Sequence, residues 1–398
     1  MTTKQNIEKA LWSACDSFRG KIDSSRYKDY ILSMLFVKYL SDVYKETREK
    51  YEKQIYNQVY KQIKKRLGNK SRDNFNIEEK YQGLGNNKTY MVKTYGCQGN
   101  IADSEKIVGI MNALGYKEVF TEIEADVIFF NTCAIRENAE NRIYGELGRL
   151  KGLKKNNPDL LICLCGCMPQ EEVTIDLLRE KYTQVDIVFG THNIASLPEY
   201  VYDAFSGQKV IEVLSIEGNI VEQIPTKREH FAKAWVDIMY GCDEFCTYCI
   251  VPYTRGKERS RRPENIIAEV EKLAKEGYTE VTLLGQNVNA YGKDFTDLEY
   301  TFANLLEDLH KTSIKRIRYT TSHPRDLDLA TIKAMSLGGN IMPNVDLPVQ
   351  SGNNEVLKRM NRKYTREVYL EKVNKLKQYV PTLSLTTDII VGFPGETD

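Results

Sequence analysis

Continuous apolar runs alternate with amphipathic helical segments over two stretches of the chain. In residues 88–215 the apolar runs lie at 90–95, 126–131, 160–165 and 186–189. Uninterrupted apolar strands between helices are typical of a parallel sheet that is covered by helices on both faces. The alternation therefore predicts a flavodoxin-like or Rossmann-like α/β domain in this part of the chain.

A second series of strands and helices follows a polar stretch at 217–228. Its predicted strands lie at 234–240, 280–284, 315–320, 344–348 and 383–391. Five such strands predict an incomplete βα barrel, whose site would be built where the strands end. The chain stops at Asp398, directly after a glycine-rich strand exit. We expect that the barrel is truncated there.

Changes in composition and in residue pattern along the chain predict its domain organisation. Apolar residues between 31 and 40 recur at helical spacing, and the charged run at 45–65 contains no proline or glycine, so we expect a short all-α segment at the start. The predicted parts are a helical segment at 1–66, a linker at 67–87, the first α/β domain at 88–215, a second linker at 216–231 and the partial barrel at 232–398.

The composition is that of an ordinary globular protein, with 41% hydrophobic and 28% charged residues among 398. No apolar run is long enough to cross a membrane, and the first residues lack the apolar stretch of a signal peptide. We therefore expect a cytoplasmic protein with no membrane partner. In a reducing compartment, nine cysteines indicate thiols that act as ligands rather than disulfides.

Cys242, Cys246 and Cys249 form a Cys-x3-Cys-x2-Cys triplet directly after an apolar run. Three thiolates on one loop can bind three irons of a [4Fe–4S] cluster and leave the fourth iron open for a substrate. A structural zinc ion is the alternative, and it would need a fourth ligand from elsewhere in the chain. The histidines that could complete such a zinc site are His192, His230, His310 and His323.

Three further cysteines, Cys97, Cys133 and Cys167, follow successive strands of the first α/β domain. Because the carboxyl ends of parallel strands converge on one edge of a sheet, these thiols are predicted to share one ligand site. Cys163 and Cys165 alternate with Cys167 along one strand. We interpret those two as core residues, and leave open that they substitute as ligands.

These motifs resemble those of the MiaB-type tRNA methylthiotransferases of the radical S-adenosylmethionine (SAM) superfamily, over residues 71–398. Tyr248, just before the third cysteine of the triplet, belongs to the resemblance, whereas Gly99 departs from it because the family has a bulkier residue there. The matching sequences are KTYGCQ at 93–98, NTCAIRENAE at 131–140, GCM at 166–168, VPYTRGKE at 251–258, LGQNVNAYG at 284–292, TSHP at 321–324, PVQSG at 348–352 and DIIVGFPGET at 388–397.

The resemblance implies a reaction and its cofactors. Cys242, Cys246 and Cys249 would bind the [4Fe–4S] cluster that cleaves SAM. The other three ligands, Cys97, Cys133 and Cys167, would bind an auxiliary [4Fe–4S] cluster whose open iron carries sulfur. The family converts N6-isopentenyladenosine at position 37 of the tRNA anticodon loop into its 2-methylthio derivative, with an external electron donor and an external sulfur source. We expect a monomer.

Two strand exits of the barrel are expected to shape the SAM pocket, although their residues could instead only form turns. The expected SAM-binding residues are Tyr248, Gly285, Gln286, Asn287, Gly392, Gly395 and Glu396. A basic cluster at 255–262 follows the cysteine loop. It could contact RNA phosphates, or form salt bridges to the acidic barrel helices.

Residues 1–66 resemble a different family, the helical start of type I restriction-system modification subunits. The paired prolines of the DNA methylation motif are missing, since none of the eleven prolines is followed by another. The segment is either a fused helical adaptor or an artefact of sequence assembly, and we favour the artefact. A DNA-binding module and a methylthiotransferase for another tRNA adenosine or for a ribosomal protein are the alternative functions.

In the resembling family the barrel continues and is followed by a small RNA-binding β-barrel called TRAM. Both would lie beyond Asp398. We therefore expect this chain to bind its clusters but to modify tRNA poorly.

Overall fold

The computed structural model describes residues 74–134, 137–213 and 220–397. All of them belong to one compact unit, Arg72–Asp398. The helical segment predicted at 1–66 lies outside the described residues. Within the described residues, no helix has the length and apolar character needed to cross a membrane.

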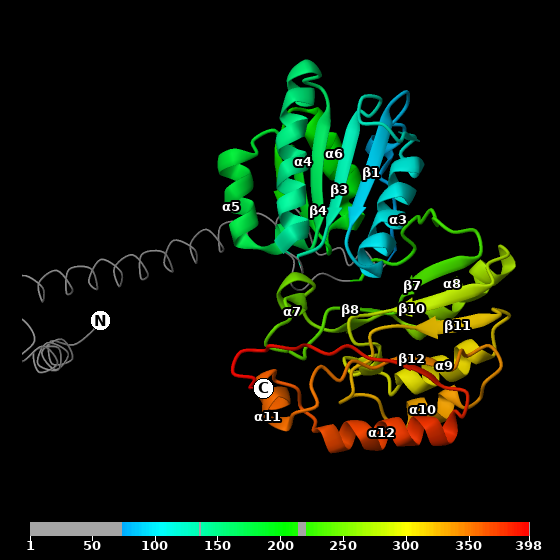
Figure 1. Cartoon of the computed structure of the whole chain (residues 1–398). Coiled ribbons are helices and arrows are strands. Elements are labelled where there is room, and N and C mark those ends of the chain that lie inside the picture. The colour runs from blue at the N-terminus through cyan, green and yellow to red at the C-terminus, as the bar shows by residue number, and fades with distance from the viewer. Residues whose placement is uncertain (1–73, 135–136, 214–219, 398) are drawn as a thin grey trace, which may run out of the picture. The chain divides into compact units, whose positions relative to one another are not determined.

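Six parallel strands form the sheet of the first domain, in the order β2-β1-β3-β4-β5-β6 (Figure 1). This order is flavodoxin-like with one added strand, and it reverses between β1 and β3. The strands are β1 (Thr89–Tyr95), β2 (Lys117–Glu118), β3 (Val127–Thr132), β4 (Leu161–Gly166), β5 (Ile187–Gly190) and β6 (Val210–Glu212). The four predicted strands are confirmed. The short strands β2 and β6 were not predicted, because neither is long enough to give an apolar run.

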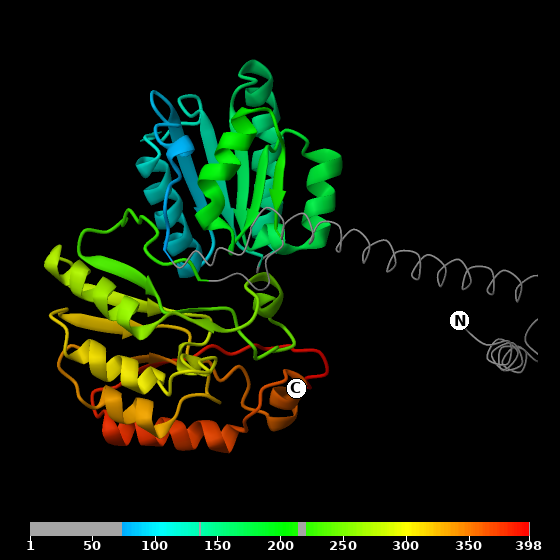
Figure 2. The same ribbon diagram turned by 180° about the vertical axis from the view of Figure 1, so that it is seen from behind.

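Helices cover both faces of this sheet, which are seen from opposite sides in Figures 1 and 2. Val127 and Phe129 of β3 pack with one pair of helices, and Ile128 and Phe130 with the other pair. The first pair is α3 (Gln98–Ala113) and α6 (Leu197–Phe205), and the second is α4 (Glu137–Asn156) and α5 (Glu172–Lys181). Double covering explains why the strand sequences are apolar without alternation. Short 3-10 helices are η1 (Glu79–Tyr81), η2 (Met168–Gln170) and η3 (Ile194–Ser196).

The second domain is the incomplete barrel that the sequence predicts. A parallel sheet has the order β11-β10-β7, and β12 pairs in parallel with β13. A single bridge from Ile317 to Ile341 joins β11 to the segment before β12. The strands are β7 (Lys233–Asp237), β10 (Glu280–Leu284), β11 (Arg316–Tyr319), β12 (Asn344–Asp346) and β13 (Ser384–Thr386), with a short antiparallel pair of β8 (Met239–Tyr240) and β9 (Arg259–Ser260).

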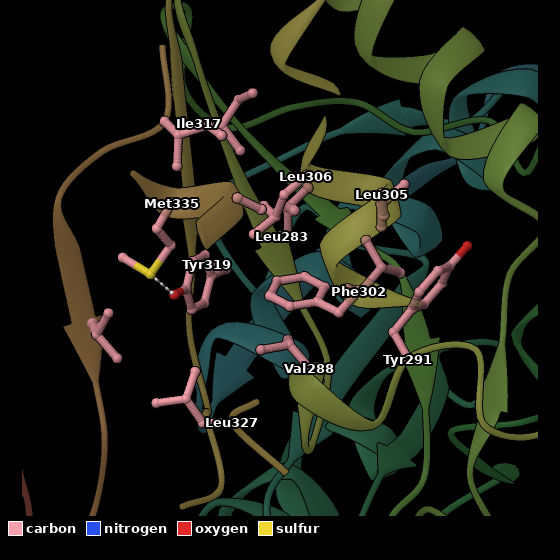
Figure 3. Packing of buried hydrophobic residues seen from close by; sticks show 14 of the residues in the cluster. Leu283, Val288, Tyr291, Phe302, Leu305, Leu306, Ile317, Tyr319, Leu327 and Met335 are labelled. Carbon is pink, nitrogen blue, oxygen red and sulfur yellow. Dashed lines mark hydrogen bonds between the residues drawn. The ribbon is translucent and has the colours of Figure 1, made fainter. Parts of the chain in front are cut away.

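Helices pack against these strands and enclose the core of the barrel. The helices are α7 (Val251–Thr254), α8 (Pro263–Lys275), α9 (Phe302–His310), α10 (Leu329–Met335), α11 (Asn354–Arg359), α12 (Arg366–Tyr379) and the 3-10 helix η4 (Val288–Ala290). Figure 3 shows Leu283 of β10 beside Phe302 of α9. The Phe302 ring meets Tyr319 edge-on with ring centroids 5.1 Å apart, and the Tyr319 hydroxyl contacts the Met335 sulfur at 2.7 Å. This packing holds the strand ends on which the polar residues of the barrel lie.

Candidate functional site

Cys97, Cys133 and Cys167 converge at the carboxyl edge of the first sheet. They follow β1, β3 and β4, respectively. The thiol of Cys133 is hydrogen-bonded to the thiols of both Cys97 and Cys167. The strands β1 and β3 also flank the point where the strand order reverses, which is where sheets of this type bind their ligands. The structure therefore brings together the three thiols that the sequence predicts as one site.

The thiols of Cys97 and Cys167 are in an environment that favours ionisation. Hydrogen bonds with Cys133, together with the charge of Arg255, lower the pKa of Cys97 to about 5 and the pKa of Cys167 to about 7. Burial opposes this effect but does not cancel it. Because the thiolate is the form that binds metal, the site suits a metal-bound group.

Cys242, Cys246 and Cys249 lie on the loop between β8 and α7. Burial raises the pKa of Cys242 to about 12 and also raises the pKa of Cys249. Arg362 Nη1 lies 3.4 Å from the sulfur of Cys246 and donates to it. Since burial disfavours the other two thiolates, this triplet would ionise on binding a metal, whose charge deprotonates coordinating thiols.

Two cysteines are placed by a preceding glycine with a positive φ angle. Gly166, before Cys167, has φ +100°, and Gly241, before Cys242, has φ +76°. A Cβ atom at Gly166 would lie 2.3 Å from the Thr132 carbonyl oxygen. A Cβ atom at Gly241 would lie 2.0 Å from the carbonyl oxygen of Lys257. A side chain fits neither turn, so glycine is required for the backbone path that presents each thiol.

Neither thiol triplet has all three of its sulfur atoms as close together as the ligands of a single zinc ion. Two ligands of one tetrahedral zinc ion stand about 3.8 Å apart. Among the described residues, only Glu244, His323 and Asp326 place three possible ligand atoms within 4.8 Å of one another. Neither described thiol triplet does so. The thiolates of a [4Fe–4S] cluster bind different irons and therefore stand farther apart.

Two of the histidines considered for a zinc site have other hydrogen-bond partners. Arg259 Nη2 donates to Nδ1 of His192 at 2.7 Å, and Nδ1 of His310 contacts Asn340 Oδ1 at 2.7 Å. His323 lies 3.8 Å from a carboxylate oxygen of Glu244. These contacts do not support a zinc site completed by His192 or His310.

Sequence reasoning missed a buried polar cluster at the strand ends of the barrel, formed by Glu244, Asn287, His323 and Asp326. Asn287 Nδ2 donates to Asp326 Oδ2 at 2.7 Å and reaches Glu244 Oε1 at 3.4 Å. Glu244 Oε2 and His323 Nε2 are buried without a hydrogen-bond partner. These residues come from three separate segments, so no spacing in the sequence relates them.

Charge in this polar cluster is unevenly distributed. Burial raises the pKa of Glu244 to about 7. Burial would also raise the pKa of Asp326, but hydrogen bonds from Arg325, Lys293 and Asn287 outweigh it, and the pKa is lowered. The cluster therefore offers an ionised carboxylate beside a carboxyl group that titrates near neutral pH.

The residues predicted for the SAM pocket after β10 are brought to the cysteine loop. Asn287 belongs to the buried polar cluster, together with Glu244 of the loop. Gly285 is buried, and a Cβ atom there would lie 2.7 Å from Cγ of Met239 in β8. Gln286 is half-buried, and Tyr248 is exposed.

Gly392, Gly395 and Glu396 form a turn after β13. The carboxylate of Glu396 accepts a hydrogen bond from the Phe393 amide at 3.0 Å, so this side chain stabilises its own turn. The Gly395 carbonyl accepts from the guanidinium of Arg359, whose own carbonyl accepts from the Thr247 hydroxyl at 3.2 Å. These residues form a turn, as in the alternative interpretation that they are turn-forming residues rather than SAM-binding ones. Arg359 connects Gly395 to the cysteine loop.

Most of the basic cluster at 255–262 forms salt bridges. The pairs are Arg255–Asp103 (2.9 Å), Arg261–Glu222 (2.5 Å), Arg261–Glu269 (2.8 Å) and Arg262–Asp297 (2.7 Å). Arg255 and Arg261 are buried, which removes them from the predicted contacts with RNA phosphates. One of their partners, Glu269, lies on the barrel helix α8, whereas Asp103 lies on α3 of the first domain.

Cys163 and Cys165 are core residues, as predicted. Both are buried in the apolar cluster beneath α3 and α6. Burial raises the pKa of each thiol well above its usual value. They are therefore poor candidates to replace Cys167.

Models of three protein families match parts of the chain. The radical SAM superfamily matches residues 236–398, and the uncharacterized protein family UPF0004 matches residues 89–190. The HsdM N-terminal domain matches residues 7–92. The superfamily match covers the barrel and implies an iron–sulfur cluster and SAM as cofactors.

Several curated relatives carry the name tRNA-2-methylthio-N(6)-dimethylallyladenosine synthase. One from Staphylococcus epidermidis is 56% identical over 353 residues, which are 88% of this chain and 69% of the relative. One from Staphylococcus haemolyticus is 58% identical over 331 residues, 83% of this chain and 64% of the relative. One from Staphylococcus aureus is 55% identical over 368 residues, 90% of this chain and 72% of the relative.

Solved structures share the fold. The radical SAM methyltransferase TsrM from Kitasatospora setae, with cobalamin and a [4Fe-4S] cluster bound, has a TM-score of 0.55 at 15% identity, over 78% of this chain and 71% of that one. The cobalamin-dependent SAM radical enzyme OxsB has a TM-score of 0.54 at 12% identity, over 76% of this chain and 49% of that one. At these identities the likeness concerns the fold.

Proposed function

Because the chain belongs to the family of tRNA-2-methylthio-N(6)-dimethylallyladenosine synthases, which are radical SAM enzymes, we propose that it adds a methylthio group to N6-dimethylallyladenosine in tRNA. Dimethylallyl is the isopentenyl group of the sequence-based prediction. The observation that supports the proposal best is the pair of thiol triplets, one at the strand ends of each domain.

Each triplet holds one cluster in this proposal. The residues that would hold the [4Fe–4S] cluster for SAM cleavage are Cys242, Cys246 and Cys249. The second triplet, Cys97, Cys133 and Cys167, binds an auxiliary [4Fe–4S] cluster. When bound, these groups supply radical chemistry and sulfur for an unactivated carbon, which acid–base side chains cannot provide.

Neighbouring residues fix the loop that carries Cys242, Cys246 and Cys249. The Thr247 amide donates to the Met360 carbonyl at 3.1 Å, and the Asn361 side chain donates to the Phe245 carbonyl at 2.8 Å. Arg362 holds the sulfur of Cys246. The loop is therefore anchored to the segment after α11.

The polar cluster beside this loop supports a pocket for SAM. Asn287, Glu244 and His323 present donors and acceptors within the barrel, and three of their buried atoms, one on each residue, lack hydrogen-bond partners. Buried polar groups without partners gain free energy when a polar ligand supplies hydrogen bonds. Gly285 keeps the strand exit close-packed against β8, and we assign Gln286, Tyr248 and the turn with Gly392, Gly395 and Glu396 to the rim of this pocket.

The adenosine lies in the single-stranded anticodon loop, at position 37, where a base can be splayed out into a protein pocket. Electrons and sulfur come from outside the chain, the chain acts as a monomer, and it works in the cytoplasm.

Product analysis tests the proposed function. The full chain, reconstituted anaerobically with iron and sulfide, is incubated with SAM, dithionite and tRNA that carries N6-dimethylallyladenosine. Mass spectrometry of the digested tRNA should detect the 2-methylthio nucleoside with the unsubstituted chain, and not with Cys242→Ala or Cys133→Ala. An iron-loaded chain that gives no product, or variants that give as much as the unsubstituted chain, would refute the proposal.

A further inference from the structure

Arg255 carries a positive charge from the barrel into the thiol site of the first domain. It directly follows α7 and is 5% exposed. Its guanidinium is hydrogen-bonded to the thiol of Cys167. A Cβ atom added at Gly99, two residues after Cys97, would lie 3.3 Å from Nη2 of Arg255. One side chain of the second domain therefore lies among the ligand residues of the first domain.

Asp103 fixes the position of this guanidinium. Nη2 of Arg255 donates to Oδ2 of Asp103 at 2.9 Å, and Asp103 is 3% exposed. Asp103 lies on α3, which begins directly after Cys97. A buried guanidinium needs acceptors for a rigid set of five N–H donors and a compensating negative charge. The carboxylate and the thiols of Cys97 and Cys167 are the groups that the structure places around it.

A buried cation at this position has a predictable effect on a bound iron–sulfur cluster. Reduction adds one negative charge to the cluster, so a nearby positive charge favours the reduced state. Hydrogen bonds to the cluster and ligand sulfurs act in the same direction. Because Arg255 and Asp103 are both buried, solvent screens these interactions little.

We infer that Arg255 is a positioning residue that raises the reduction potential of the cluster at Cys97, Cys133 and Cys167, and that the carboxylate of Asp103 opposes it. This inference rests on the proposed function, since it needs the auxiliary cluster. Arg255 belongs to the segment that carries the other triplet.

Potentiometric titration of the auxiliary cluster alone tests this role. The full chain with Cys242→Ala, Cys246→Ala and Cys249→Ala is reconstituted anaerobically and titrated with dithionite, and the reduced cluster is followed by EPR. In this background Arg255→Gln should lower the midpoint potential, and Asp103→Asn should raise it. Arg255→Lys keeps the charge and should stay closer to the parent than Arg255→Gln does.

A matched control comes from the same basic segment. Arg262 pairs with the exposed Asp297, so Arg262→Gln should leave the midpoint potential unchanged. Shifts of opposite sign for Arg255→Gln and Asp103→Asn support a charge effect, because damage to the fold alone would not reverse its sign. Loss of iron from Arg255→Gln but not from Arg255→Lys also supports it.

The result also separates this inference from the function on which it rests. A background protein that binds no iron overturns the auxiliary cluster, and with it the two-cluster proposal. A background protein that binds iron and keeps its midpoint potential in Arg255→Gln overturns only the role of Arg255.

Discussion

Among single side chains, His192 shows how a candidate metal ligand can have another use. Because an arginine can only donate, Nδ1 of His192 accepts the hydrogen bond from Arg259, and its imidazole is neutral. Burial, followed by the charges of Arg259 and Arg255, lowers the pKa of His192 to about 3. The unfolded chain binds a proton at this histidine below about pH 6.5, whereas the folded chain does not. His192 therefore lowers stability as the pH falls from about 6.5 towards 3.

The variant His192→Asn should reduce this pH dependence, because asparagine can accept the same hydrogen bond but does not titrate. Between pH 7.5 and 5.5, the free energy of unfolding of the unsubstituted chain should fall by about 1 kcal/mol more than that of the variant. Urea denaturation at the two pH values measures the difference. Equal losses in both proteins would show that His192 is not held neutral.

The six candidate ligand cysteines could be predicted from the sequence, but the polar residues beside them could not. Cys242, Cys246 and Cys249 reveal themselves by spacing within one loop. Cys97 and its two partners do so because strand exits of a parallel sheet converge. Glu244 and Asp326 meet only through the folding of the barrel, and neither residue type is unusual where it stands in the chain.

At the level of strands and helices, the strand exits determine where the thiols lie. Gly166 ends β4 with a positive φ angle, and a side chain there would collide with the backbone of β3. Gly207 has a similar φ of +82° but has no atom within 4 Å of an added Cβ. A substitution at Gly207 therefore introduces backbone strain alone, whereas one at Gly166 introduces backbone strain and a steric collision.

We expect Gly207→Ala to destabilise the chain by about 1 kcal/mol, which is the cost of the left-handed conformation. Gly166→Ala should cost more than about 2 kcal/mol, because the end of β4 has to move away from β3. It should also weaken iron binding at Cys167, whereas Gly207→Ala should not. Urea denaturation and iron analysis of both variants check this. Similar behaviour of the two variants would contradict the assigned role of the turn.

The principal elements could be predicted, and the exceptions have a physical cause. Continuous apolar runs identified β1, β3, β4, β5 and β10. The short strand β8 is the end of the run predicted at 234–240, whereas β2, β6 and β9 contain two or three residues each and are held by neighbours rather than by their own pattern. Their existence depends on tertiary packing, which propensity and periodicity do not describe.

In the molecule as a whole, buried ion pairs join α3 to the barrel. Lys106 Nζ donates to Asp237 Oδ2 of β7 at 2.5 Å, beside the Arg255–Asp103 pair. Such pairing could not be predicted, because the sequence does not show which charges the packed domains bring together.

The boundary at residue 66 stays a prediction. The match to the Staphylococcus aureus relative covers 90% of this chain, so the aligned region extends into residues 1–66.

We expect Lys106→Met to destabilise the chain by about 3–5 kcal/mol, since it leaves the Asp237 carboxylate buried without this partner. The double variant Lys106→Met/Asp237→Leu should be more stable than Lys106→Met alone. As a control, Lys375→Met breaks the exposed pair with Glu371 and should cost less than about 1 kcal/mol. Urea denaturation compares the three variants, and equal losses for Lys106→Met and Lys375→Met would show that the buried pair has no special role.

The iron content of the reconstituted chain tests the central claim, that the two thiol triplets each bind a [4Fe–4S] cluster. We predict about eight irons per chain for the unsubstituted protein, and about four after alanine replaces either triplet. The triplets are Cys97, Cys133 and Cys167, and Cys242, Cys246 and Cys249. About four irons in the unsubstituted chain, with no change when alanine replaces the first triplet, would contradict the claim.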